Sequence, residues 1–83
     1  MTFEVKLSPQ SAKFLRRQDI HIRERLKTAL TKLREEPFQY LEHFEGADHY
    51  KYRIGDYRSL IDVDLASKIV WVRVLDKRGR IYK

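Results

Sequence analysis

The chain has 83 residues with no cysteine and a formal net charge of +6, which excludes disulfide bridges and thiolate chemistry. This length allows one domain with a modest core, so we expect a single domain over residues 1–83. The sequence shows neither a signal-peptide pattern nor an apolar run of about 18 residues and, with the lack of cysteine, predicts a cytoplasmic protein.

The amino-terminal part predicts one strand and two helices. Residues 2–7 alternate apolar and polar side chains, which is typical of a half-buried strand. Ser8 and Pro9 suit the N-cap and the first position of a helix that we expect to end near Gln18. Asp19 suits a second N-cap, and the helix after it carries an apolar stripe. The residues expected to face inward are Ala12, Phe14 and Leu15 in the first helix and Ile22, Leu26, Ala29, Leu30 and Leu33 in the second.

Pro37 is expected to end the second helix, because the residue before a proline avoids helical backbone angles. Two consecutive helices of this kind form an antiparallel or V-shaped pair. Residues 38–49 are expected to be a connection whose apolar side chains pack on the core, and Gly46 interrupts it before the next strand.

Residues 50–63 predict a two-stranded hairpin. Gly55 and Asp56 separate two alternating runs, and glycine at the first of two turn positions is typical of a type II′ turn. This turn fixes the register, so Arg53 is expected to stand opposite Arg58. Like charges in that position destabilise a sheet by up to about 1 kcal/mol, and a bound anion would remove this cost. The other expected pairs are Ile54 with Tyr57, Tyr52 with Ser59, Lys51 with Leu60, and Tyr50 with Ile61.

After a turn at Leu65–Lys68, a last strand is expected over Ile69–Leu75. Pairing of Asp64 with Ile69 would place Val70, Val72 and Val74 on the face that meets the helices. The order of elements predicts an α+β fold. It has an N-terminal strand, an antiparallel helix pair, and then a three- or four-stranded, mainly antiparallel sheet with both helices on one face.

The other face of the sheet is expected to gather positive charge. Residues 1–50 hold nine Lys or Arg against eight Asp or Glu, whereas residues 51–83 hold nine against four. A localised basic face suits nucleic acid or an acidic protein, and the alternative is a solvated surface. Arginine matches phosphate oxygens in a two-point fork, which favours phosphate as the ligand. The residues of this basic face are Lys51, Arg53, Arg58, Arg73 and Arg78, with Trp71 and Leu60 among them.

Four motifs follow one another in the second half of the chain: an alternating basic strand, GDYR at residues 55–58, two apolar strands and the tail KRGRIY. This order resembles the RelE/ParE toxin superfamily of bacterial and archaeal toxin–antitoxin systems, and the tail looks closest to the archaeal type of RelE. The resemblance spans the whole chain, including the helix pair before Pro37. It implies a RelE-like fold and a ribosome-dependent messenger RNA endoribonuclease that cuts in the ribosomal A site, inhibits translation and uses no metal or other cofactor.

The resemblance also implies site residues and partners. The family uses a cluster of basic residues and often a tyrosine, and the matching positions are Lys51, Arg53, Arg58, Arg78 and Tyr82. Further RNA contacts are expected from Arg73, Lys77, Arg80 and Lys83. The implied partners are the ribosome with its messenger RNA and a cognate RelB-like antitoxin, which binds a monomeric toxin and can form a heterotetramer with it.

The chemistry can also be argued from the residues. RNA carries its own nucleophile, the 2′-hydroxyl, so a protein that aligns it with the adjacent phosphate can cleave without a metal. Arg53 and Arg58 are suited to stabilising the negative charge that develops on the phosphate. Arg78 is suited to stabilising the phosphate or to protonating the leaving 5′ oxygen. Tyr82 suits base stacking or proton transfer. Many relatives have a histidine before the tail that this chain lacks, and Lys51 is a better base than Arg53, because arginine stays protonated.

Two other functions stay open at this point: a ParE-like inhibitor of DNA gyrase with the same fold, and a non-catalytic RNA-binding module. The basic tail with its tyrosine favours the nuclease, because a gyrase inhibitor has no need for arginines that converge with a tyrosine on one face.

The remaining polar and aromatic residues are interpreted as structural. No nucleophile or carboxylate stands at a meaningful spacing from the histidines, which are His21, His43 and His49. Asp62 and Asp64 are interpreted as partners of Arg73 or Arg58 rather than as a catalytic pair. Trp71 is interpreted as a packing or antitoxin-contact residue, because aromatic side chains dominate interfaces.

Overall fold

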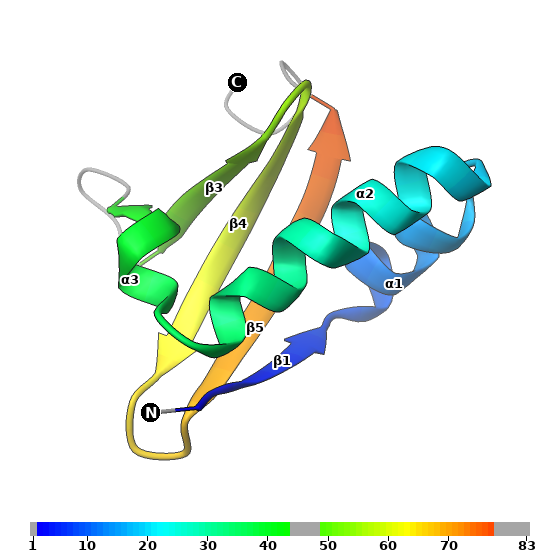
Figure 1. Cartoon of the computed structure of the whole chain (residues 1–83). Helices are drawn as coiled ribbons and strands as arrows, with labels where there is room; N and C mark the ends of the chain where they lie inside the picture. Colours follow the sequence, from blue (N-terminus) through cyan, green and yellow to red (C-terminus); the bar gives the residue numbers. More distant parts are fainter. Residues whose placement is uncertain (1, 44–48, 78–83) are drawn as a thin grey trace.

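The computed structural model describes residues 2–43 and 49–77 (Figure 1). Its elements form an α+β fold, as the sequence predicts, and no helix in the described ranges is long and apolar enough to cross a membrane. In chain order they are β1 (Glu4–Leu7), α1 (Pro9–Arg16), α2 (Ile20–Thr31), a 3₁₀ turn η1 (Lys32–Arg34), α3 (Pro37–Tyr40), β2 (Glu42–His43), β3 (Tyr50–Ile54), β4 (Tyr57–Asp64) and β5 (Ile69–Lys77).

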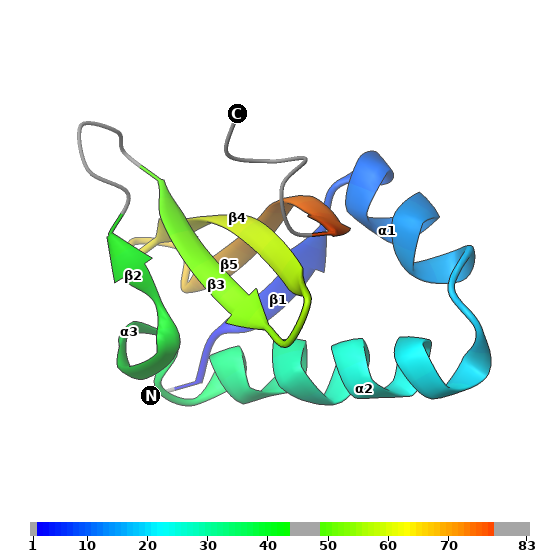
Figure 2. The ribbon, with the colours of Figure 1, turned by 90° about the horizontal axis from the view of Figure 1, so that it is seen from above.

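The strands form one five-stranded sheet in the order β1-β5-β4-β3-β2. Every neighbouring pair is antiparallel except β1 with β5, which run parallel. Figure 2 shows α2 lying across one face of the sheet, and the ring of Phe14 on α1 meets Tyr57 on that same face. Both helices therefore cover one side, and no helix among the described residues covers the other side. The core between them consists of Phe3, Leu15, Leu26, Leu30, Leu33, Tyr52, Ile54, Tyr57, Ile61, Val70, Val72 and Leu75.

The helix starts agree with the sequence, whereas the helix ends do not. The side chains of Ser8 and Asp19 cap α1 and α2 by accepting hydrogen bonds from free backbone amides. However, α1 ends at Arg16 rather than near Gln18, and α2 ends at Thr31 and tightens into η1. Pro37 does not end α2, because it occupies the first position of α3, where a missing amide is tolerated.

The prediction of a plain connection over residues 38–49 is also wrong. This segment contributes most of α3 and the two-residue strand β2, which pairs Glu42 with Lys51 and His43 with Tyr50. A strand this short carries too few alternating residues to be read from the sequence.

A bulge in β5 corrects the placement of Val74. Ile61 pairs with Val72 but Leu60 pairs with Val74, so Arg73 is an extra residue between the two pairs. One extra residue shifts the alternation that follows it to the opposite face. Val74 consequently lies with Leu60 on the helix-free face, and Leu75 is fully buried in the core in its place.

Gln10 holds α1 to the sheet beyond the end of β1. Its side-chain Nε2 donates to the carbonyl of Leu75 at 3.1 Å, and its Oε1 accepts from the amide of Leu75 at 3.0 Å. The amide side chain thus forms the hydrogen bonds to the edge of β5 that the backbone of a neighbouring strand would form. It also covers a strand edge that could otherwise pair with another chain.

Candidate functional site

The β3–β4 hairpin has the predicted turn and register. Gly55 has φ +59° and Asp56 does not have a positive φ, which is the pattern of a type II′ turn. All five predicted pairs are present, including Arg53 opposite Arg58. A Cβ at Gly55 would overlap only the guanidinium of Arg25 on α2, the flexible end of a side chain that can move aside, so the positive φ is the main reason for glycine there.

A tyrosine anchors this hairpin to the helix layer. Tyr52 of β3 donates from its hydroxyl to the carbonyl of Ala29 on α2 at 2.6 Å. Burial of the ring, together with the neighbouring Tyr40, raises the pKa of Tyr52 above its usual value. The hydroxyl therefore stays a donor at neutral pH, and β3 has a fixed position relative to α2.

Arg58 is held by the turn that precedes it. Only 7% of the residue is exposed, and its Nη1 donates to the carbonyls of Gly55 at 2.8 Å and Tyr57 at 2.9 Å. Within residues 2–43 and 49–77, no carboxylate forms an ion pair with it. A guanidinium has five N–H donors, so the described residues leave three of them for a ligand. The turn thus fixes a partly desolvated cation in advance, which is the arrangement that stabilises developing negative charge.

Lys51 and Arg53 share one acidic neighbour that the sequence did not indicate. Glu42 on β2 lies 4.0 Å from the Nζ of Lys51 and 3.9 Å from the Nε of Arg53. The Arg53 side chain is 65% exposed and that of Glu42 is 56% exposed, so solvent weakens these pairs. The exposed Arg53 therefore remains accessible to an anion that competes with Glu42.

Asp62 connects two side chains on the same helix-free face. Its Oδ1 lies 2.7 Å from Nδ1 of His49, and its Oδ2 accepts from Nε of Arg73 at 2.7 Å. Partial burial alone would raise the pKa of Asp62, but the hydrogen bonds from His49 and Arg73 outweigh it and lower the pKa below its usual value. The interpretation of Asp62 as a partner of Arg73 is correct, whereas Asp64 instead accepts from the amide of Ser67 in the β4–β5 turn.

The contact between His49 and Asp62 corrects one premise about the histidines, whereas their interpretation as structural residues stays a prediction. A carboxylate does stand at a meaningful position, because pairing of Tyr50 with Ile61 brings the preceding His49 beside the following Asp62. The hairpin register, extended by one pair, would have revealed this contact from the sequence.

Trp71 lies among cations on this face. The ammonium of Lys6 on β1 is 5.5 Å from the centre of the Trp71 ring, and the guanidinium carbon of Arg73 is 5.0 Å from it. Such contacts stabilise a desolvated cation beside the ring face. The role of Trp71 as a packing or antitoxin-contact residue stays a prediction.

Lys77 does not join the basic face. It pairs with Tyr57, whose ring is buried on the helix side, and directly paired residues share a face. Its inclusion among the RNA contacts is therefore not supported by the register. The tail residues Arg78, Arg80, Tyr82 and Lys83 lie outside the described residues, so their assignments stay predictions.

Residues 5–82 match the family model described as the ParE toxin of the type II toxin–antitoxin system parDE. The chain belongs to the RelE/ParE toxin superfamily. No curated protein matches it at a significant level.

Solved structures of RelE toxins share this fold. The chain is 30% identical to a protein in the archaeal RelE–RelB complex from Pyrococcus horikoshii, with a TM-score of 0.81 over 96% of this chain and 99% of that one. A mutant of the Escherichia coli toxin RelE in the free state is 25% identical, with a TM-score of 0.77 over 95% and 86%. A RelBE complex from Mycobacterium tuberculosis is 22% identical with a TM-score of 0.80 over 94% and 100%, which shows the fold alone.

Proposed function

We propose that this type II toxin is a ribosome-dependent messenger RNA endoribonuclease that blocks translation by cutting messages in the ribosomal A site. The main support is the pre-positioned cation of Arg58, which the turn carbonyls hold on the helix-free face opposite Arg53. The likeness to RelE toxins over nearly the whole chain supports the same activity class.

The proposed reaction uses the 2′-hydroxyl of RNA as the nucleophile and needs no metal. Arg58 and Arg53 stabilise the negative charge on the phosphorane as the 2′ oxygen attacks, and Lys51 adds a third cation from the same strand. Arg78 and Tyr82, assigned by resemblance, help with the leaving 5′ oxygen and the adjacent base. The products are a 2′,3′-cyclic phosphate and a 5′-hydroxyl.

A cognate antitoxin of the RelB type is the second proposed partner. The Pyrococcus horikoshii structure holds RelE together with RelB, and so does the Escherichia coli RelBE complex. A short protein with acidic, amphipathic segments would suit the basic surface of this toxin. We expect the toxin to be a monomer that this antitoxin neutralises, with a heterotetramer as the larger form.

One observation favours a second candidate, inhibition of DNA gyrase. The matching family model is described by ParE rather than by RelE. The basic pair at Arg53 and Arg58 favours the nuclease, because a protein inhibitor has no need for cations pre-positioned around a phosphate. A non-catalytic RNA-binding module is the third candidate.

An in vitro translation assay distinguishes these functions. The nuclease proposal expects purified protein to stop translation and to leave ribosome-bound messages cut within codons, whereas free RNA is cut slowly or not at all. Intact messages with blocked supercoiling would favour gyrase inhibition, and intact messages with bound RNA would favour the passive module. Primer extension on the messages and a supercoiling assay provide the two measurements.

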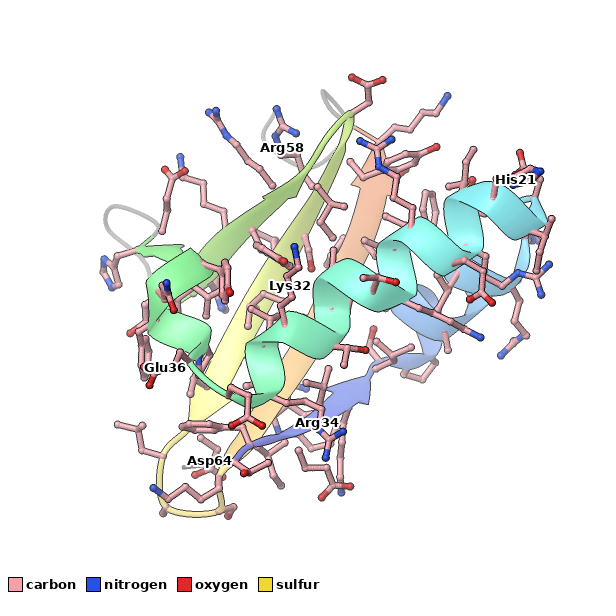
Figure 3. All side chains as sticks on the ribbon, viewed as in Figure 1. His21, Lys32, Arg34, Glu36, Arg58 and Asp64 are labelled. Carbon is pink, nitrogen blue, oxygen red and sulfur yellow. The ribbon has the colours of Figure 1, made fainter. Side chains whose placement is uncertain are left out.

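Variants test the site assignment in the same assay. Arg58→Ala and Arg78→Ala are each expected to abolish toxicity. Arg34→Ala is the matched control, because Arg34 is an exposed arginine on η1, far from the turn end of the hairpin where Arg58 lies (Figure 3). Retained toxicity in both test variants would overturn the assignment.

A further inference from the structure

A groove of about 600 Å³ lies between α2 and β3, beside the hairpin of the proposed site. One wall is the side of α2 that faces β3, the other is β3 itself, and Tyr40 of α3 also lines it. The hydrogen bond from the hydroxyl of Tyr52 to the carbonyl of Ala29 joins the two walls. Among the described residues, no strand pairs with the outer side of β3 beyond Lys51. This α2–β3 groove is therefore open to a ligand that also reaches the hairpin.

The α2–β3 groove carries an excess of positive charge. Arg25 and Lys32 line it from the α2 side and Arg53 lines it from β3, whereas Glu24 is the one carboxylate among its lining residues. Arg25 and Lys32 are exposed, and no described carboxylate forms an ion pair with either of them. Figure 3 shows Lys32 directed from the end of α2 towards the hairpin. Cations without counter-ions along a groove favour an anionic ligand.

Arg25 connects this groove with the proposed phosphate site. Its guanidinium lies where a side chain at Gly55 would stand, with Cζ 3.0 Å from the position of a Cβ there. Arg58 donates to the carbonyl of the same glycine at 2.8 Å. The two guanidinium groups thus approach one turn residue, Arg25 from the helix layer and Arg58 from the helix-free face. A polyanion bound to Arg58 at the turn can therefore continue past Arg25 into the groove.

The spacing and the side chains of the groove suit single-stranded RNA. Arg25 and Lys32 are seven residues apart, which is two helical turns or about 10 Å along the helix axis. Tyr40 is 40% exposed and its ring centre is 6.3 Å from that of Tyr52. Exposed aromatic rings beside cations bind single strands by stacking on bases, and this combination favours RNA over an acidic protein segment.

We infer that the α2–β3 groove binds the segment of the message next to the cleaved bond. Arg25 and Lys32 bind phosphates of this segment, and the ring of Tyr40 stacks on one of its bases. The groove thus holds the strand while the hairpin cations hold the scissile phosphate. This inference rests on the proposed nuclease function and adds substrate contacts outside the hairpin.

The test measures the dissociation constant of the toxin from two sets of programmed ribosomes at several salt concentrations. In the first set the message runs through the A site and has 2′-deoxy residues in the A-site codon, which removes the nucleophile and keeps the message uncut. In the second set the message ends with the P-site codon. The wild type is expected to bind the first set more tightly.

Arg25→Ala and Lys32→Ala are each expected to weaken binding to the first set about 3- to 10-fold and to leave binding to the second set unchanged. Each variant loses one phosphate contact, so the slope of log affinity against log salt should become shallower by about 0.7. Tyr40→Ala is expected to weaken binding at least about 5-fold without a change of slope, because stacking releases no counter-ion. Tyr40→Phe keeps the ring and should bind like the wild type.

The matched controls are Lys27→Ala and Arg34→Ala. They remove an exposed lysine and an exposed arginine from the same helix and the turn after it, but these residues line the groove on the other side of α2, against β1. Both controls are expected to keep the wild-type affinity and salt slope. An equal loss in the controls would assign the effect to net charge and overturn the inference.

The outcomes separate this inference from the function on which it rests. If the wild type leaves an ordinary ribosome-bound message intact, the nuclease proposal and the inference both fail. If the wild type cuts and both Arg25→Ala and Lys32→Ala bind the first set like the wild type, only the inference fails. Equal weakening on the two sets would assign the cations to ribosomal RNA. A loss of affinity for a poly-glutamate peptide alone would assign them to an acidic protein, and either result overturns the inference.

Discussion

Arg58 stands opposite Arg53 across the β3–β4 ladder, and its guanidinium is bonded to the carbonyls of its own hairpin turn. The turn carbonyls partly compensate the positive charge of Arg58 and so weaken its repulsion of Arg53. They also fix the direction of the three remaining donors. The hairpin thus holds two like charges on neighbouring strands, which is the basis of the proposed phosphate site.

Replacement of Arg58 by lysine tests whether charge alone is sufficient. Lysine keeps the positive charge but lacks the planar guanidinium fork, whose Nη1 donates to both carbonyls while its other nitrogens stay directed away from them. We expect Arg58→Lys to lose most of the toxicity and to lower the free energy of unfolding by about 1–3 kcal/mol, because two hydrogen bonds near the core are lost. Urea unfolding and the translation assay provide the measurements. Full activity in Arg58→Lys would show that the fork is not required.

Gln10 should contribute to stability although it is largely on the surface. Gln10→Ala removes both hydrogen bonds to Leu75 and is expected to lower the free energy of unfolding by about 1–3 kcal/mol. Gln10→Glu keeps the acceptor but loses the donor, and a similar loss is expected. Gln39→Ala on α3 is the matched control, because Gln39 is an exposed glutamine whose side chain makes no hydrogen bond to another described residue. Equal midpoints for Gln10→Ala and the control would contradict the role of Gln10.

Gly55 is constrained by its backbone angle and by its neighbour. Gly55→Ala is expected to lower the free energy of unfolding by about 1–2 kcal/mol from the positive φ, and the overlap with Arg25 should add little, because the end of that side chain can move. Arg25→Ala should relieve the overlap but not the backbone cost. A double-mutant cycle followed by thermal unfolding separates the two. If Arg25→Ala fully restored the stability of the Gly55→Ala variant, the positive φ would carry no free-energy cost, which would contradict this prediction.

The ion pairs of Asp62 should make stability depend on pH. Its folded pKa is lowered, whereas an unfolded aspartate titrates near pH 3.9. The stabilisation is therefore present above that value and is lost as the pH falls through the folded pKa. We expect the advantage of the wild type over Asp62→Asn in urea unfolding to be constant near pH 7 and to shrink from about pH 4 downwards. An advantage that persists unchanged at pH 2 would contradict these pairs.

Local chemistry explains why so much of this fold can be predicted from the sequence. The caps at Ser8 and Asp19 and the II′ turn at Gly55 depend on bonds and angles within a few residues. Once the turn is known, the pairing of Arg53 with Arg58 follows by counting. The pairing of Asp64 with Ile69 follows in the same way from a short turn.

Tertiary structure decided what depends on contacts between distant segments. Because of the bulge at Arg73, Leu75 rather than Val74 lies in the core. The sequence of β5 does not indicate where the strand accommodates an extra residue. The bond between Gln10 and Leu75 joins residues 65 positions apart. The sequence by itself determined the hairpin and its two arginines, because a turn fixes its own register. Only the folded sheet showed that Leu75 rather than Val74 enters the core and that Gln10 bonds to Leu75, because these contacts join segments that meet only when the sheet forms.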